Sequence, residues 1–212
     1  MAQGRFISFE GGEGAGKSTQ IAFLTEHLEK AGIRVLKTRE PGGSAGAEEI
    51  RKLLVTGDPG RWDAMTELLL LYAARRDHVE RVIKPALAKN TWVISDRFAD
   101  STMAYQGYGH GLGREAVQQL HKLVLGDFTP DMTILLDLPV AEGLARTQGR
   151  DGDETRYEEM EVAFHERMRA GFQEMAGSEP ERFTTIDANA GIEEVAHAVW
   201  MAVVQKFNLL AK

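Results

Sequence analysis

Short apolar stretches alternate with amphipathic segments along the chain. The stretches that predict strands cover residues 5–10, 33–38, 91–96, 132–138 and 182–187. The other segments carry apolar residues three and four positions apart, which predicts helices over 17–31, 46–55, 62–88, 114–125, 140–149, 157–176 and 192–207. This alternation is typical of an α/β fold, so we expect a five-stranded parallel sheet with helices on both faces.

Composition and charge narrow the classes of protein to consider. A length of 212 residues suits a single domain over 1–212, with a small charged excursion at about 147–157 that we interpret as a lid. The formal net charge of −7 disfavours a nucleic-acid binder, which needs a basic surface. No apolar run is long enough to span a membrane, and the first strand begins too early to follow a signal peptide. Cysteine is absent, which fits a cytoplasmic protein.

A glycine-rich loop joins the first strand to the first helix and matches the pattern G-x-x-x-x-G-K-[ST]. Loops of this kind surround polyphosphates with backbone N–H groups and a helix N-terminus, so we expect a P-loop NTPase-type three-layer fold. Lys17 is expected to reach the outer phosphates, and the Ser18 hydroxyl to ligate Mg²⁺. The residues expected to surround the polyphosphate are Gly11, Gly12, Glu13, Gly14, Ala15, Gly16, Lys17, Ser18 and Thr19. A chance match is the alternative, and the flanking strand and helix argue against it.

The third strand ends in Asp96 and Arg97. Ligands of open parallel sheets lie beyond the carboxyl ends of the strands, so Asp96 is expected to hold Mg²⁺ and Arg97 to bind phosphate oxygens. The alternative is an aspartate that caps a turn beside a solvated arginine.

Helix 62–88 places a charge on its apolar face. Arg75 lies between Tyr72 and Val79 in the row that faces inward, and an inward arginine needs an anionic ligand or an internal salt bridge. Leu71 lies one turn earlier and can cover the same pocket. The six histidines show no metal-ligand spacing, so we interpret them as surface or helix residues.

Two further segments carry groups suited to nucleotide chemistry. Residues 101–107 combine hydroxyls, an amide and a tyrosine that can bind a base or a sugar, although a polar helix with a buried tyrosine is the better explanation of this segment taken alone. The excursion at 147–157 carries Arg150 and Arg156, which suit a lid that brings positive charge to a transferred phosphoryl group or, alternatively, a solvated loop.

Taken together, the residues resemble the thymidylate kinase family in its bacterial form, over nearly the whole chain. The segments that carry the resemblance are FEGGEGAGKST (9–19), TREPGGS (38–44), EEIRKLL (48–54), YAARRDHVERVIKPAL (72–87), VISDRFADSTMAYQGYGHG (93–111) and PDMTILLD (130–137).

The resemblance implies a reaction and a set of roles. The γ-phosphoryl group of ATP passes to dTMP with Mg²⁺, giving dTDP and ADP, in a homodimer. The implied catalytic residues are Lys17, Arg97, Glu13 and the lid arginines Arg150 and Arg156, with Ser18 and Asp96 at the metal. The implied substrate-binding residues are Glu40, Arg51, Leu71, Arg75, Arg97, Thr102, Tyr105 and Gln106.

Within that set, the resemblance assigns each group a part of dTMP. Arg51 and Arg97 bind its phosphate, Arg75 its thymine edge, and Glu13 its 3′-hydroxyl. Thr102 and Gln106 contact the base, Tyr105 lies beneath the sugar, and Glu40 helps to organise the magnesium and acceptor site. The chain departs from the family at Leu71, where phenylalanine is usual. The alternatives are another nucleoside monophosphate kinase and a P-loop nucleotide-binding switch.

Overall fold

The computed structural model describes residues 3–58, 60–147, 157 and 160–209. Its strands are β1 (Phe6–Glu10), β2 (Val35–Arg39), β3 (Trp92–Asp96), β4 (Met132–Asp137) and β5 (Phe183–Asp187). They form one parallel sheet in the order β2-β3-β1-β4-β5. The predicted α/β fold with a five-stranded parallel sheet is confirmed, and each predicted strand overlaps an observed one.

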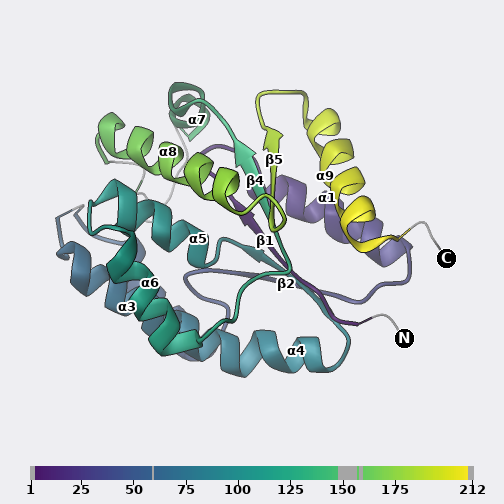
Figure 1. Ribbon diagram of the computed structural model, residues 1–212, viewed down its shortest axis with the longest axis horizontal. Helices are drawn as coiled ribbons and strands as arrows, with labels where there is room; N and C mark the ends of the chain where they lie inside the picture. Colours follow the sequence, from purple (N-terminus) through teal and green to yellow (C-terminus); the bar gives the residue numbers. More distant parts are fainter. Residues whose placement is uncertain (1–2, 59, 148–156, 158–159, 210–212) are drawn as a thin grey trace.

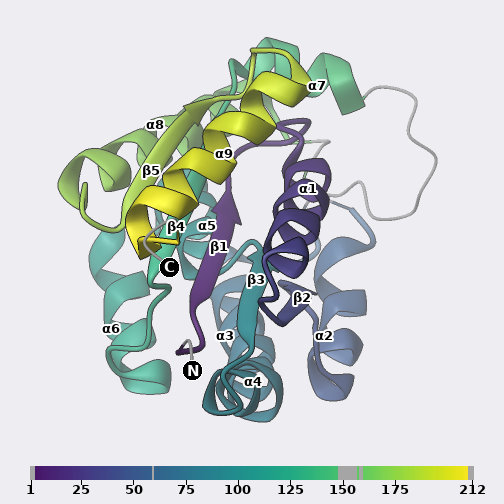
Figure 2. The ribbon, with the colours of Figure 1, turned by 90° about the vertical axis from the view of Figure 1, so that its right-hand side faces the viewer.

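Helices cover both faces of the sheet (Figure 1). They are α1 (Lys17–Lys30), α2 (Ala45–Val55), α3 (Ala64–His78), α4 (Lys84–Ala88), α5 (Ala99–Thr102), α6 (Arg114–Leu125), α7 (Val140–Thr147), α8 (Val162–Ser178) and α9 (Ile192–Phe207). Helices α1 and α9 lie on one face, and α3, α6 and α8 lie on the other (Figures 1 and 2). Within the described residues no helix has the length and apolarity that a membrane span requires.

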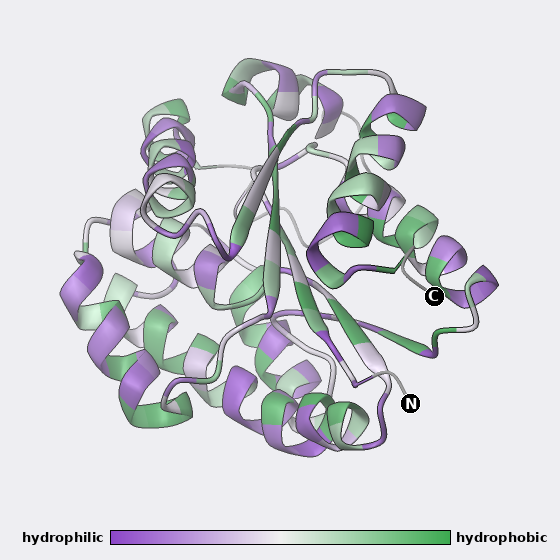
Figure 3. Ribbon diagram, turned by 45° about the vertical axis from the view of Figure 1, so that its right-hand side comes forward, coloured by the Kyte–Doolittle hydropathy of each residue, from purple (hydrophilic) through white to green (hydrophobic). Residues whose placement is uncertain are grey.

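The two-residue period of the strands divides the core into two layers. In β1, Phe6 packs among residues of α3 and α8, whereas Ile7 and Phe9 pack among residues of α1 and α9. The central strands are buried on both sides, which explains their nearly continuous apolar sequence. Figure 3 shows the same arrangement, with hydrophobic strands inside and hydrophilic stretches on the helices.

Most predicted boundaries lie within two residues of the observed ones, and three predicted helices need comment. The predicted helix 62–88 is interrupted by a π-helical turn, η1 (Val79–Ile83), just before Pro85, which has no N–H to continue the regular ladder. Helix α8 begins at Val162 rather than at residue 157. Residues 140–149 were predicted as helical, and α7 is described up to Thr147.

One helical segment was considered only as an alternative, the polar helix with a buried tyrosine over residues 101–107. Residues 99–109 form α5 followed by a second π-helical stretch, η2 (Met103–Gly109). Glycine has poor helix propensity, and this stretch is stabilised by tight packing on α8 instead. A Cβ atom added at Gly109 would lie 2.5 Å from the Phe164 ring, and one added at Gly171 would lie 2.6 Å from the Tyr108 ring. Only glycine permits this approach of the two elements.

Helix α7 approaches the glycine-rich loop closely through another pair of glycines. Gly14 has a φ of +68°, and a Cβ atom added there would lie 2.2 Å from the carbonyl oxygen of Gly143 in α7. A Cβ atom added at Gly143 would lie 2.4 Å from the carbonyl oxygen of Glu13. Backbone therefore packs on backbone, and α7 supports the loop from outside.

We predict that Gly143→Ala destabilises the fold by about 1–3 kcal/mol, because the added methyl group pushes α7 away from the loop. The free energy of unfolding, measured in urea, checks this. Gly177→Ala in α8 is the matched control, since a Cβ atom there meets nothing within 4 Å, and alanine in a helix gains up to about 1 kcal/mol. Equal stability of the two variants contradicts the proposed contact.

Candidate active site

The glycine-rich loop wraps around the position that an outer phosphate requires. Gly11, Gly14 and Gly16 all have positive φ, which a side chain disfavours. Lys17, the first residue of α1, is almost fully buried, and its Nζ donates to the carbonyl oxygens of Gly12 at 2.8 Å and Gly11 at 3.2 Å. Burial lowers the pKa of Lys17, with a further lowering from the positive charge of Arg97. The lysine is thus held at the open side of the loop.

Two side-chain oxygens that can ligate a metal ion lie close together beside the loop, one from Ser18 and one from Asp96. The hydroxyl of Ser18 donates to Oδ2 of Asp96 at 3.0 Å, and both side chains line the same cavity. The described residues contain no cluster of three or more acidic, histidine or cysteine groups that could enclose a metal ion. A hydroxyl and one carboxylate fit Mg²⁺, which commonly uses few protein ligands and takes the rest from water and phosphate.

Arg97 connects the loop to the acceptor half of the cavity. Its guanidinium donates from Nη2 to Oε1 of Glu13 at 2.9 Å and from Nη1 to the Gly11 carbonyl at 3.0 Å. Its backbone has a φ of +68°, a conformation that costs a non-glycine residue about 1 kcal/mol or more. The Ser95 hydroxyl donates to the Arg97 carbonyl at 2.7 Å and helps to hold this conformation.

Glu13 is fixed as a carboxylate between Arg97 and Tyr105. Burial raises its pKa, but the positive charges of Arg97 and Lys17 and a hydrogen bond from Tyr105 outweigh burial and lower the pKa to about 2. The Tyr105 hydroxyl donates to Oε1 of Glu13 at 2.5 Å, and burial raises the pKa of Tyr105, so it remains a donor. The Tyr105 ring also lies under the Arg97 guanidinium, 5.0 Å from centroid to Cζ.

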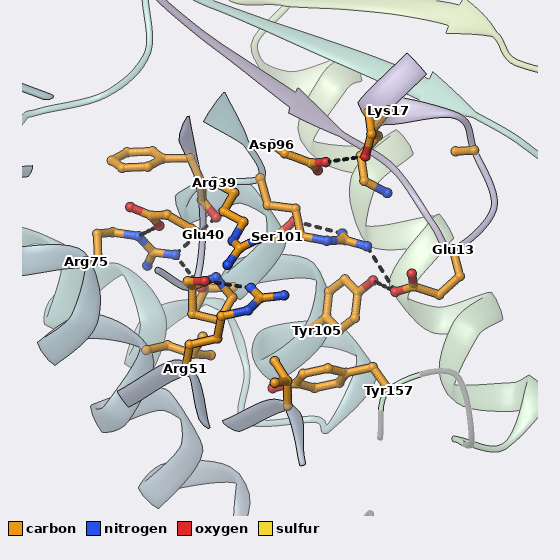
Figure 4. Close-up of a pocket in the computed structure, with 18 of the residues that line it drawn as sticks. Glu13, Lys17, Arg39, Glu40, Arg51, Arg75, Asp96, Ser101, Tyr105 and Tyr157 are labelled. Atoms are coloured by element: carbon orange, nitrogen blue, oxygen red, sulfur yellow. Dashed lines mark hydrogen bonds and ion pairs between the residues drawn. The ribbon is translucent and has the colours of Figure 1, made fainter. Parts of the chain in front are cut away.

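Arg75 is buried and is held from several sides, and Figure 4 shows it beside Glu40. Its Nε donates to Oε2 of Glu40 at 2.6 Å, and its Nη2 donates to the Phe98 carbonyl at 3.1 Å and the Thr102 hydroxyl at 2.8 Å. The other oxygen of Glu40 lies 2.9 Å from Nδ1 of His78. The internal salt bridge considered for Arg75 therefore exists, and it leaves Nη1 buried without a partner among the described residues.

Gln106, like Arg75, uses only some of its polar atoms in hydrogen bonds within the described structure. Its Nε2 donates to Oε1 of Glu67 at 2.6 Å, while its own Oε1 is buried and has no partner in the described structure. Leu71 and Val55 supply an apolar wall to the same cavity. An apolar wall with a few placed polar groups is the usual form of a ligand site.

These groups line one cavity of about 290 Å³ at the carboxyl edge of the sheet. The predicted site residues that line it are Glu13, Gly14, Ala15, Gly16, Lys17, Ser18, Thr19, Glu40, Arg51, Leu71, Arg75, Asp96, Arg97, Thr102, Tyr105 and Gln106. Gly11 and Gly12 of the loop do not line this cavity, and their carbonyl oxygens accept hydrogen bonds from Lys17. Arg150 and Arg156 lie outside the described residues.

Two residues of the site, Val55 and Tyr157, were not predicted. Both line the cavity, as do Arg39 and Ser101, and the Tyr157 ring meets the Tyr105 ring edge-on at 5.4 Å. His78 was interpreted as a surface or helix residue. It does lie in helix α3, but it is fully buried and not at the surface. Its signal was the spacing of three residues from Arg75, which places both side chains on one helix face.

Comparisons with known proteins point to one family. The sequence pattern of the family described as "Thymidylate kinase" matches residues 9–199. The chain is 54% identical over 209 residues to the thymidylate kinase of Caulobacter vibrioides, covering 99% of this chain and 100% of that one. It is 51% identical to that of Magnetococcus marinus, covering 97% and 98% of the two chains.

The chain belongs to the thymidylate kinase family. The crystal structure of thymidylate kinase from Ehrlichia chaffeensis has the same fold, with a TM-score of 0.76 and 37% sequence identity over 96% of this chain and 99% of that one. The family resemblance noted in the sequence is thereby confirmed.

Glu10 is a buried acid directly behind this thymidylate kinase site, at the end of β1. The Phe98 N–H donates to its Oε1 at 2.8 Å, and the Ser101 hydroxyl lies 2.5 Å from its Oε2. Burial, followed by the negative charge of Asp100, raises the pKa of Glu10 from 4.5 to about 8. The protonated form is therefore the one that the fold prefers at neutral pH.

We predict that Glu10→Gln makes the protein more stable than the wild type toward alkaline pH. A raised folded-state pKa means that the contribution of Glu10 is complete below pH 4.5 and is lost as the pH rises through about 8. Glutamine keeps an acceptor for Phe98 and does not titrate. Urea unfolding across this window is expected to show the wild type losing up to about 1 kcal/mol per pH unit relative to the variant. Parallel pH profiles of the two proteins contradict the assignment.

Proposed function

We propose that this chain transfers the γ-phosphoryl group of ATP to dTMP, giving dTDP and ADP. The observation that carries the proposal is that the phosphate loop and a base pocket open into one cavity, with Lys17 and Arg97 between them. Two nucleotides placed end to end in this cavity bring donor and acceptor phosphates together at the two cations. Proximity of this kind is the main requirement of phosphoryl transfer.

The ATP half uses the loop and the start of α1. Backbone N–H groups of residues 11–19 surround the β- and γ-phosphates, and Lys17 neutralises charge on the transferred group. Ser18 and Asp96 are the residues that would hold Mg²⁺, which supplies positive charge at the phosphates when it is bound. Their oxygen donors lie 3.0 Å apart in the cavity.

The base half presents one free donor and one free acceptor. Nη1 of Arg75 donates to O4 of thymine, and Oε1 of Gln106 accepts from its N3–H. Both atoms are buried and lack partners among the described residues, which supports their assignment to a ligand. Thr102 supports Arg75 from the cavity wall, and Leu71 covers the face of the base.

The sugar and phosphate of dTMP lie between these halves. Arg97 and Arg51 bind the acceptor phosphate, Glu13 accepts a hydrogen bond from the 3′-hydroxyl, and the Tyr105 ring lies beneath the sugar. Because the acceptor phosphate is already anionic, the transfer needs no strong general base. The role of Glu40 is to hold Arg75, since both its oxygens are engaged by Arg75 and His78.

Three further assignments rest on the family. Arg150 and Arg156, which lie outside the described residues, are assigned by the family resemblance to bring positive charge to the transferred group, and the chain is assigned one domain over 1–212. The enzyme acts in the cytoplasm as a homodimer. Support for a dimer comes from exposed apolar side chains on α2, α3 and α6, namely Leu53, Met65, Leu69 and Leu123.

The proposal is tested by ADP release with ATP, Mg²⁺ and a panel of monophosphates: dTMP, dUMP, dCMP, AMP, GMP and UMP. We expect dTMP to be the preferred acceptor. Lys17→Ala is the control for the loop, with an expected loss of about 10²-fold or more in kcat and an unchanged fold. Absence of turnover with dTMP, or a clear preference for another acceptor, contradicts the proposal.

We predict that Leu71→Phe lowers the KM for dTMP by about two- to tenfold, because an aromatic face adds about 0.5–1.5 kcal/mol of stacking on the base. Leu71→Met is the matched control, since it keeps an apolar cover without a π-face, and its KM is expected to stay near that of the wild type. Initial-rate kinetics at saturating ATP measure both. A KM that is unchanged or raised in Leu71→Phe places the base elsewhere.

A further inference from the structure

We propose that Glu67 determines which pyrimidine the base pocket accepts, although it does not touch the substrate. It acts as a positioning residue: its carboxylate fixes the orientation of the Gln106 amide, and this orientation admits thymine and rejects cytosine. The inference rests on the proposed function, because it assumes that the base lies against Arg75 and Gln106.

Glu67 lies on the same face of α3 as the residues that form the pocket. It precedes Leu71 by four residues and Arg75 by eight, so the three side chains follow one another along one helix stripe. Glu67 is 0% exposed and Gln106 is 1% exposed. The contact between them, 2.6 Å from Nε2 of Gln106 to Oε1 of Glu67, is thus formed away from water.

A carboxylate leaves the amide only one orientation. An ionised glutamate accepts hydrogen bonds and cannot donate them, whereas a glutamine amide has an accepting and a donating end. The nitrogen of Gln106 must therefore face Glu67, because the reversed amide would bring two oxygens together in a buried place. Gln106 lines the cavity, and its oxygen, which has no partner among the described residues, is left for the ligand.

Arg75 is also held in place, but it leaves a donor for the ligand where Gln106 leaves an acceptor. Glu40, Phe98 and Thr102 engage its Nε and Nη2, and Nη1 remains as a donor. The pocket thus offers a donor beside an acceptor. Thymine matches this pattern with O4 and N3–H, whereas cytosine has an amino group at position 4 and an unprotonated N3, so both of its groups are mismatched.

His110 also approaches Glu67, with 3.4 Å between its Nε2 and Oε1. A purely structural role, in which Glu67 ties α3 to η2 through Gln106 and His110, predicts a loss of stability and an equal loss of activity toward every pyrimidine nucleotide. The positioning role predicts a change in the ratio between substrates. The two roles are therefore separable by measuring that ratio.

The experiment compares kcat/KM for dTMP, dUMP and dCMP in the wild type and in Glu67→Gln. A glutamine at this position can accept or donate, so the Gln106 amide is free to turn. We expect kcat/KM for dTMP to fall by about tenfold through KM, and the dTMP-to-dCMP ratio to fall by about tenfold as well. The dTMP-to-dUMP ratio is the internal control and should not change, because uracil has the same hydrogen-bonding edge as thymine.

A double-mutant cycle tests the route through Gln106. Gln106→Met removes the oriented amide, so it should lower the dTMP-to-dCMP ratio by itself, and adding Glu67→Gln to it should change that ratio no further. An unchanged ratio in Glu67→Gln, or independent effects in the double variant, overturns the inference. Failure of the wild type to phosphorylate dTMP would instead refute the proposed function.

A measurement on the wild type covers the case in which Glu67→Gln does not fold. The side-chain amide protons of Gln106, followed by ¹⁵N NMR, are expected to be protected from solvent exchange both before and after dTMP is added. Loss of that protection on binding shows that the amide has turned away from Glu67, and it overturns the inference.

Discussion

The pairing of buried cations with buried carboxylates is the constraint on which this site depends. A cavity that binds two polyanions needs several cations at one edge of the sheet, and before the substrates arrive those cations are removed from water without their ligands. Leaving them unpaired costs several kcal/mol each. The fold resolves this with Glu40 against Arg75 and Glu13 against Arg97. The acidic residues inside this phosphate-binding cavity are thus needed to neutralise its buried arginines before the substrates bind.

The two pairs differ in a way that suits their roles. The Arg75–Glu40 pair is nearly inaccessible, with 2% and 4% of the side chains exposed, and it is held further by His78. The Arg97–Glu13 pair is more open, at 17% and 18%. The first pair is a permanent part of the base pocket, and the second can share its arginine with an incoming phosphate. Rigid recognition of the base and an adjustable phosphate contact follow from this difference in burial.

Much of this arrangement could be predicted from the sequence, because the strands, the glycine-rich loop and the Asp96–Arg97 pair depend on local pattern and on the meeting of parallel strands at one edge. The helix over 99–109 could be foreseen only as an alternative for residues 101–107, because its glycines and polar residues oppose a helical prediction and its packing on α8 involves residues far away in the chain. Glu67 and His78 were missed for the same reason. Each is one charged or polar residue in a helical stripe, and its importance comes from a partner on another element.

The central claim is that the cavity is prearranged around two paired arginines, and a crystal structure with dTMP and a non-hydrolysable ATP analogue tests it most directly. The account predicts that the acceptor phosphate lies at Arg97 facing the loop around Lys17, while Arg75 keeps its contact with Glu40 and directs Nη1 to O4 of the base. A base bound away from Arg75, or an Arg75 that leaves Glu40 to reach the ligand, contradicts it.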